Sequence, residues 1–277
     1  MKFQVERDVL AEAVAWAART LPARPAQPML AGILIEADKN SLTLSAFDYE
    51  VSSRVSIDAG ISESGKVLVS GKLFADISRS LPNQPVVGTL NGSRLEIKCG
   101  KANFALPTLP PDDYPTLPPL PKTSGSAKAK VFAESVAQVA VAAGRDESLP
   151  MLTGIRVEIE GNTITLAATD RYRLAVKEFS WNPNDPKVST AALVPARTLA
   201  EGAKGFLNSN EILISLASDK DKLMGFEGEG RRTTTRLLDA DFPKYRSLLP
   251  SESSSTADVS TQELLDAIKR VELVAER

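Results

Sequence analysis

One long segment occurs twice in this sequence, and that repeat limits what the chain can fold into more than any other feature. Residues 28–36, PMLAGILIE, return as residues 150–158, PMLTGIRVE, at a shift of 150 − 28 = 122 positions. At the same shift and without a gap, residues 42–48 return as residues 164–170. A repeat with so long a period predicts an array of like modules rather than one continuous domain.

Composition narrows the class of protein. A chain of 277 residues, 43% of them apolar and 25% charged, suits about two ordinary globular domains. The sequence has no histidine and one cysteine, Cys99, which excludes His-based catalysis, an intrachain disulfide and the usual zinc sites. We therefore expect a non-enzymatic protein without a metal or cofactor, in a reducing compartment.

Hydropathy and charge add two further limits. No apolar run approaches the roughly 18 residues that a membrane helix needs, and residues 1–8 turn polar too early for a signal peptide. We therefore expect a cytoplasmic protein that makes no membrane contact. The formal net charge of −2 excludes overall basicity, but it leaves room for a local basic stripe.

Helix and strand patterns alternate through the first repeat. Apolar residues at helical spacing predict a helix over residues 8–19, with Asp8 as a plausible cap. Asn91-Gly92 predicts a tight hairpin turn between two strands. The expected strands are residues 33–36, 42–46, 51–57, 67–69, 86–90 and 94–98, and a second helix is expected over residues 72–80.

The second repeat follows the same plan. We expect helices over residues 136–143 and 197–207, strands over 155–159 and 163–167 around Gly161-Asn162, and three more strands ending near Arg236. Proline-rich stretches followed by the polar tracts 122–127 and 251–256 indicate linkers. The predicted domains are therefore 1–122, 128–251 and 256–277.

Residues 259–277 predict one more amphipathic helix, similar to the opening helix of each repeat. A single helix of this kind cannot bury its apolar face without a sheet, so we expect the start of a truncated third module. The alternative is a short C-terminal helix docked on the second module.

Basic residues recur at matching positions of the two repeats. At a shift of 125, Lys72 matches Arg197 and Arg79 matches Lys204, and the seven-residue spacing puts each pair on one helical face. Such faces suit sequence-independent contact with phosphate, although solvated surface bases are a common alternative. Arg24, in a loop stiffened by prolines, and Arg145, in the equivalent loop, are further candidates.

Three segments, together with the doubled module, carry a resemblance to a known family. LPMLTGI at 149–155, ATDRYRLAV at 168–176 and DFPKYRSLLP at 241–250 resemble the bacterial DNA polymerase III β subunits, the sliding clamps. The resemblance implies an α+β fold of repeated clamp modules, each with two inner helices packed on outer antiparallel sheets. It also implies a head-to-tail homodimeric ring that encircles double-stranded DNA and acts as a DNA polymerase processivity factor.

The same resemblance implies partners and a place in the cell. The partners are the DNA polymerase III catalytic subunit, the clamp loader and other proteins with a clamp-binding motif, and the location is the cytoplasm, in association with the nucleoid. A full-length member is a homodimer, whereas residues 1–277 alone are expected to be mainly monomeric. The alternative function is a protein-interaction scaffold without DNA binding, which basic residues scattered over different faces would favour.

By resemblance, a partner-peptide pocket lies between the second and third modules, with apolar anchoring positions and a polar rim. Two rim positions depart from the family, since Arg171 stands where glycine is common and Ser247 where arginine is common. The family also completes this pocket with a Met-Pro tail that is missing here, so weaker peptide binding is expected. The implied pocket residues are Leu152, Thr169, Arg171, Tyr172, Arg173, Leu174, Pro243, Ser247 and Leu248.

Asp48 and Asp170 permit one enzymatic interpretation, as a pair of acid–base carboxylates. Each follows a strand at the same point of its repeat. A structural residue repeats together with its fold, whereas an active site seldom needs duplication. We therefore predict that both aspartates cap turns.

Overall fold

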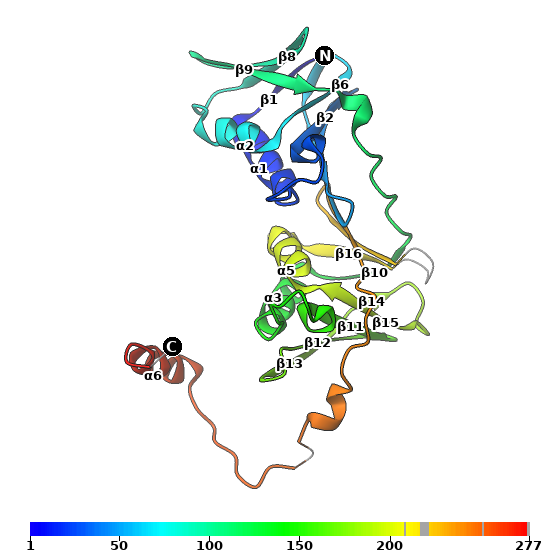
Figure 1. Cartoon of the computed structure of the whole chain (residues 1–277), viewed down its shortest axis with the longest axis vertical. Helices are drawn as coiled ribbons and strands as arrows, with labels where there is room; N and C mark the ends of the chain where they lie inside the picture. The colour runs from blue at the N-terminus through cyan, green and yellow to red at the C-terminus, as the bar shows by residue number, and fades with distance from the viewer. Residues whose placement is uncertain (208, 217–221, 251, 276–277) are drawn as a thin grey trace. The chain divides into compact units, whose positions relative to one another are not determined.

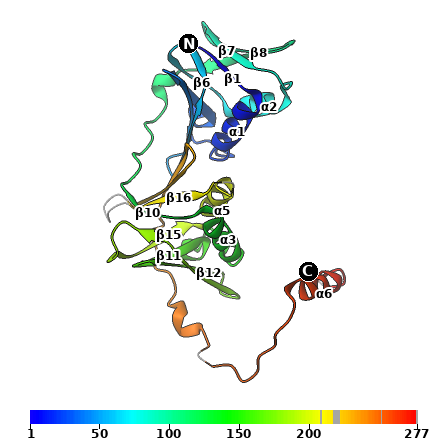
Figure 2. The ribbon, with the colours of Figure 1, turned by 180° about the vertical axis from the view of Figure 1, so that it is seen from behind.

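The computed structural model describes residues 1–207, 209–216, 222–250 and 252–275. It forms two compact units, Met1–Phe242 and Pro243–Arg277. The first unit contains both copies of the repeat (Figures 1 and 2). The second contains a short 3-10 helix, η3 (Tyr245–Leu248), and one helix, α6 (Thr261–Glu272).

Module one contains two helices, α1 (Arg7–Ala18) and α2 (Gly71–Ser80), and two short 3-10 helices, η1 (Pro28–Ala31) and η2 (Pro111–Asp113). Its strands are β1 (Lys2–Val5), β2 (Gly32–Asp38), β3 (Ser41–Phe47), β4 (Val51–Asp58), β5 (Gly60–Glu63), β6 (Gly65–Ser70), β7 (Val86–Asn91), β8 (Arg94–Cys99) and β9 (Ala102–Leu109).

Module two repeats this order with helices α3 (Ala129–Ala140), α4 (Pro150–Thr153) and α5 (Ala196–Gly205). Its strands are β10 (Thr123–Lys128), β11 (Gly154–Glu160), β12 (Thr163–Thr169), β13 (Leu174–Ser180), β14 (Asn182–Pro183), β15 (Ser189–Pro195), β16 (Glu211–Leu216), β17 (Leu223–Gly228) and β18 (Arg231–Arg236). The shift of 122 is kept by β2 and β11 (154 − 32) and by β3 and β12 (163 − 41), and α2 and α5 keep the shift of 125 (196 − 71). The predicted repeat is confirmed.

The strand pairings in the described residues are antiparallel and form two sheets. The larger sheet has 14 strands in the order β14-β10-β16-β17-β18-β4-β3-β2-β6-β9-β8-β7-β1-β5, and the smaller has the order β13-β12-β11-β15. The larger sheet crosses from one module to the other, because β18 pairs with β4 from Arg231↔Val55 to Thr235↔Val51. Paired helices on antiparallel sheets confirm the predicted α+β class.

In each module the two longer helices pack together and cover one side of the strands (Figure 1). The contact follows from sequence spacing, because Leu10, Val14 and Ala17 recur on one face of α1 and are buried. Phe74 and Ile77 give α2 a similar buried face. The opposite faces of these helices are therefore free to carry polar groups. In the described residues, no helix is long and apolar enough to span a membrane.

Four local predictions were wrong. Glu6, not Asp8, precedes α1, and Asp8 lies in the first turn, where it accepts a hydrogen bond from Arg7. Asn91 pairs with Arg94, so Gly92-Ser93 forms the turn, and Gly92 has φ +58°. Helix α3 begins at Ala129 rather than at residue 136, because Ala129, Phe132, Ala133 and Val136 recur at helical spacing and are all buried. The polar tract predicted as a linker over 122–127 contains strand β10, which pairs with β16 and β14.

Candidate functional site

The four predicted helical bases take equivalent places on α2 and α5. Lys72 and Arg197 are the second residues of their helices, and Arg79 and Lys204 lie seven positions further on. All four are exposed, and the side chain of Arg197 is 90% exposed. Buried Phe74 and Leu199 fix the orientation of the two helices from the opposite face. The two modules therefore present a base at the same two helical positions.

Two of these bases form ion pairs with acidic residues on the same helices. Arg79 forms an ion pair with Asp76, and the Nε of Arg197 lies 3.2 Å from Oε1 of Glu201. Exposed pairs of this kind contribute only about 0–1 kcal/mol, so a phosphate can replace the carboxylate at little cost. Sequence reasoning missed both pairs, although their i,i+3 and i,i+4 spacings are visible in the sequence.

The two loop arginines lie in equivalent loops after the first helix of each module, as predicted, and a short helix rather than a strand follows each loop. Arg24 is exposed between α1 and η1, and Arg145 is exposed between α3 and α4. Arg145 and Arg197 line the same pocket, together with Glu147. The structure thus brings one loop arginine of module two next to the first base of α5.

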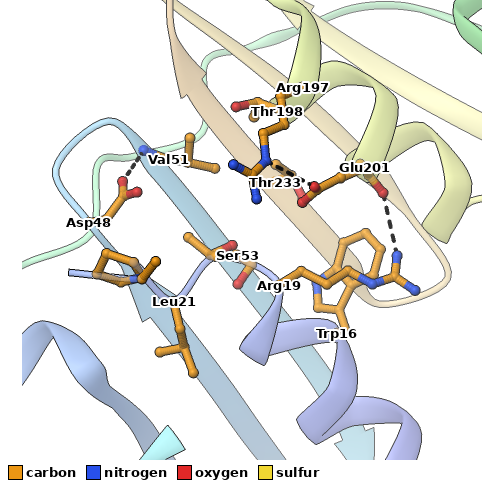
Figure 3. A pocket seen from close by; sticks show the side chains of 14 residues that line it. Trp16, Arg19, Leu21, Asp48, Val51, Ser53, Arg197, Thr198, Glu201 and Thr233 are labelled. Carbon is orange, nitrogen blue, oxygen red and sulfur yellow. Dashed lines mark hydrogen bonds and ion pairs between the residues drawn. The ribbon is translucent and has the colours of Figure 1, made fainter. Parts of the chain in front are cut away.

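Sequence reasoning also missed the joint between the modules, which lies beside these helices (Figure 3). The Trp16 ring at the end of α1 packs edge-on against Phe206, with 5.1 Å between ring centroids. The guanidinium carbons of Arg19 and Arg231 lie 5.4 Å and 5.6 Å from the centroid of the Trp16 ring. Arg231 also donates to the carbonyl of Gly205, and its Nη2 lies 3.1 Å from Glu12 Oε2. Module two is therefore fixed to the first helix of module one.

The predicted turn role of both repeat aspartates is confirmed. Asp48 Oδ1 accepts hydrogen bonds from the backbone N–H groups of Glu50 at 3.0 Å and Val51 at 2.7 Å. Asp170 Oδ1 accepts from the backbone N–H groups of Tyr172 at 3.1 Å and Arg173 at 3.0 Å. Partial desolvation opposes ionisation of Asp170, but these hydrogen bonds keep the pKa of its carboxyl below the usual value. Carboxylates held in this way define a loop rather than an acid–base pair.

That loop groups most of the module-two residues of the predicted peptide pocket. Thr169 is buried, and its hydroxyl donates to the carbonyl of Arg173 at 2.8 Å and accepts from the N–H of Arg171 at 3.2 Å. Tyr172 is 90% exposed, and Leu174 is half-buried at the start of β13. Leu152, from α4, is buried.

The other three predicted pocket residues, Pro243, Ser247 and Leu248, belong to the second unit. Ser247 Oγ donates to the carbonyl of Lys244 at 2.9 Å, and Leu248 is 71% exposed in η3. The meeting of these residues with the module-two loop remains a prediction.

Comparison with known proteins gives the class of this chain. Residues 1–118 match the family model of the DNA polymerase III beta subunit N-terminal domain, and residues 126–244 match that of the central domain. The beta sliding clamp of Streptomyces coelicolor is 56% identical over 279 residues, an alignment that covers 100% of this chain and 74% of that protein. The beta sliding clamp of Micrococcus luteus is 50% identical and is covered over 89% of its length.

A solved structure gives the same result. The DNA polymerase sliding clamp of Bacillus subtilis superposes with a TM-score of 0.90 at 27% identity, covering 100% of this chain and 75% of that one. The chain belongs to the DNA polymerase III beta subunit family.

Proposed function

We propose that this chain works as a DNA polymerase processivity factor, a sliding clamp that encircles duplex DNA and tethers the replicative polymerase and other partners. The observation that carries this proposal is the repeated placement of exposed bases on α2 and α5, at Lys72 and Arg197 and again at Arg79 and Lys204. Duplex DNA is a repeating polyanion, and a repeated basic helix suits it without reading its sequence.

The role of these bases is electrostatic and non-catalytic. Together with Arg24 and Arg145, they contact backbone phosphates and release counterions, so binding weakens as salt rises. A ring holds its DNA topologically and needs little affinity at each contact. A chain with a net charge of −2 therefore serves a polyanion through local bases alone.

The joint between the modules supports the proposed assembly into a ring. Strand β4 of module one pairs with β18 of module two. In the repeat, β13 is the counterpart of β4 and β9 is the counterpart of β18, and in the described residues β13 has one paired neighbour, β12. Phe104 on β9 is exposed, whereas its counterpart Thr233 (233 − 104 = 129) is buried at the joint. Strand β9 pairs with β6 only through Leu68↔Leu109 and Val69↔Thr108. The rest of that side of β9 and the second side of β13 suit the same antiparallel pairing with further modules, head to tail.

The peptide pocket receives partners through an apolar slot with a polar rim. The proposed slot comprises Leu152, Leu174, Pro243 and Leu248, and the proposed rim is the loop that Asp170 holds. The proposed partners are the polymerase catalytic subunit, the clamp loader and other proteins with Leu/Phe anchors. The proposed domains remain 1–122, 128–251 and 256–277, with β10 leading into the second, and the proposed location is the nucleoid in the cytoplasm.

Lysine protection tests the DNA-facing surface. Reductive methylation in the presence of a short duplex is expected to spare Lys72 and Lys204 on the helices. Lys66 and Lys98 on strands β6 and β8 are matched internal controls and are expected to react fully. Equal protection of all four lysines, or protection of the strand lysines alone, would contradict the proposal that the DNA lies against the helices.

A further inference from the structure

A cavity of about 270 Å³ opens at the joint between the two modules, beside the basic helices. The end of α1, strand β4, helix α5 and strand β18 all contribute to its wall, as Figure 3 shows. Among its lining residues are Trp16, Arg19, Thr20, Arg197, Thr198 and Thr233. None of these residues except Arg197 belongs to the DNA-facing or peptide-binding sets.

The cavity is rich in hydrogen-bond donors that lack strong acceptors. Trp16 is 3% exposed, and its Nε1–H has no hydrogen-bond partner in the described part of the chain. An indole N–H can only donate, so burying it alone costs free energy. Arg19 donates to the carbonyl of Glu201 at 3.4 Å, and no carboxylate of the described residues lies within ion-pair distance of its guanidinium.

Two carboxylates, Asp48 and Glu201, also line this wall, and each accepts hydrogen bonds through one oxygen. Asp48 Oδ1 receives two backbone N–H groups, and Glu201 Oε1 receives the Nε of Arg197. Of the charges that act on Arg19, that of Arg231 has the larger effect and that of Glu201 the smaller. Withdrawal of its guanidinium from water, and then the nearby charge of Arg231, lower the pKa of Arg19, while Glu201 raises it. An anion in this place would offset the repulsion between the two arginines.

We propose that the joint cavity binds a phosphate group, held by Arg19 and Arg197 with the neighbouring threonine hydroxyls as further donors. Guanidinium and hydroxyl donors form the charge-assisted hydrogen bonds that phosphate oxygens favour. The volume suits a molecule of about mononucleotide size. The phosphate has two sources, a small phosphate ester in solution or the backbone of duplex DNA lying against the helices.

Calorimetric titration at constant ionic strength tests the site with three probes: inorganic phosphate, 2′-deoxyadenosine 5′-monophosphate and 2′-deoxyadenosine. Saturable binding of the two phosphates, with no binding of the nucleoside, is the expected result. Arg19→Gln is expected to raise Kd for the monophosphate at least tenfold. The matched control Arg54→Gln, which removes an arginine of β4 that lies outside the cavity, is expected to change Kd less than twofold.

Two additions keep the test decisive. Arg197→Gln alters a side chain that is 90% exposed, so this variant keeps the core intact. It is expected to weaken binding of the monophosphate as well. This result would stand even if Arg19→Gln disturbed the joint. Competition by a short duplex assigns the site to DNA phosphate, and its absence assigns the site to a free phosphate ester. Lys72→Gln is expected to weaken DNA binding without changing the Kd of the monophosphate. The phosphate site and the proposed DNA contact can therefore be contradicted independently of each other. Absence of saturable binding, equal effects of Arg19→Gln and Arg54→Gln, or equal binding of the nucleoside would overturn the proposal.

Discussion

Tyr49 and Arg171 occupy the same position of the repeat, 171 − 49 = 122 residues apart, and both hold a left-handed backbone, with φ of 75° and 83°. Neither is glycine, although this conformation costs other residues about 1–2 kcal/mol. In both modules the aspartate immediately before them fixes the loop through two backbone N–H groups. The strain is therefore a property of the repeated loop, and in module two that loop carries the proposed peptide rim.

Substitution at Arg171 measures this strain. Arg171→Gly is expected to leave the free energy of unfolding unchanged or to raise it by up to about 1 kcal/mol, since glycine accepts positive φ but loses more entropy on folding. Arg171→Val is expected to lower it by more than about 1 kcal/mol, because a β-branched residue fits this conformation poorly. Urea unfolding of both variants gives the comparison. A valine variant as stable as the glycine variant would show that the loop carries no such strain.

Two glycines of α5 allow the packing at the joint to be tested. A Cβ on Gly205 would lie 1.9 Å from Cζ3 of Trp16, whereas a Cβ on Gly202 meets nothing within 4 Å. Gly205→Ala is expected to destabilise the protein by about 1–3 kcal/mol through overpacking. Gly202→Ala is expected to stabilise it by about 0.5–1 kcal/mol through helix propensity. Thermal unfolding of the two variants measures both effects. Shifts of Tm with the same sign in both variants would contradict the packing described for the joint.

Tyr114 predicts an effect of alkaline pH. It is buried against Phe47 and Leu68, and burial raises the pKa of its hydroxyl to about 12. Because the folded pKa lies above the unfolded value near 10, this contribution to stability is complete below pH 10 and is lost as pH rises towards 12. The loss amounts to about 2–3 kcal/mol.

Tyr114→Phe is the matching test, because Phe242 stands at the equivalent place of the second module. The Tyr114 hydroxyl makes no hydrogen bond of ordinary geometry in the described part of the chain, although the backbone of Phe47 lowers its pKa in part. Its removal is therefore expected to be neutral or slightly stabilising at pH 7. The variant should also lose the part of the alkaline destabilisation that belongs to this residue. A marked loss of stability at pH 7 would show that the hydroxyl is hydrogen-bonded.

The peptide pocket is tested at two of its module-two positions. Tyr172→Ala and Leu174→Ser are each expected to weaken binding of a Leu/Phe-anchored peptide about tenfold or more, because buried anchors dominate such interfaces. Leu73→Ser, on α2, removes a side chain that is also exposed and serves as the control. Fluorescence anisotropy with a labelled peptide gives the affinities. Equal effects of the three substitutions would place the peptide elsewhere.

The sequence allowed the fold to be predicted where pattern and repeat agree. Strands β2, β3, β11 and β12 and helices α2 and α5 were predictable because each has a strong period and a second copy in register. Strand β10 was missed because its residues are mostly polar, and only pairing with β16 and β14 makes it a strand. Gly125 within it is required by close approach, since a Cβ there would lie 2.4 Å from the carbonyl oxygen of Asn182.

The candidate site was predictable only in part. The equivalent bases on α2 and α5 and the turn aspartates recur at fixed shifts, so one sequence suffices to find them. The contact between Trp16 and Phe206 joins residues 190 positions apart. The period of one helix shows which face is buried but not what covers it, so the joint and its cavity emerged only from the structure.

The salt dependence of duplex binding tests the central claim most directly. A variant with Lys72, Arg197 and Lys204 changed to Gln is compared with one in which Arg54, Lys66 and Lys98, all on strands, are changed to Gln. Each lost phosphate contact reduces the slope of log K against log salt by about 0.9. We expect the helix variant to bind more weakly with a slope smaller by about 2–3, and the strand variant to match the wild type. An unchanged slope for the helix variant, or an equal loss in the strand variant, would contradict the account.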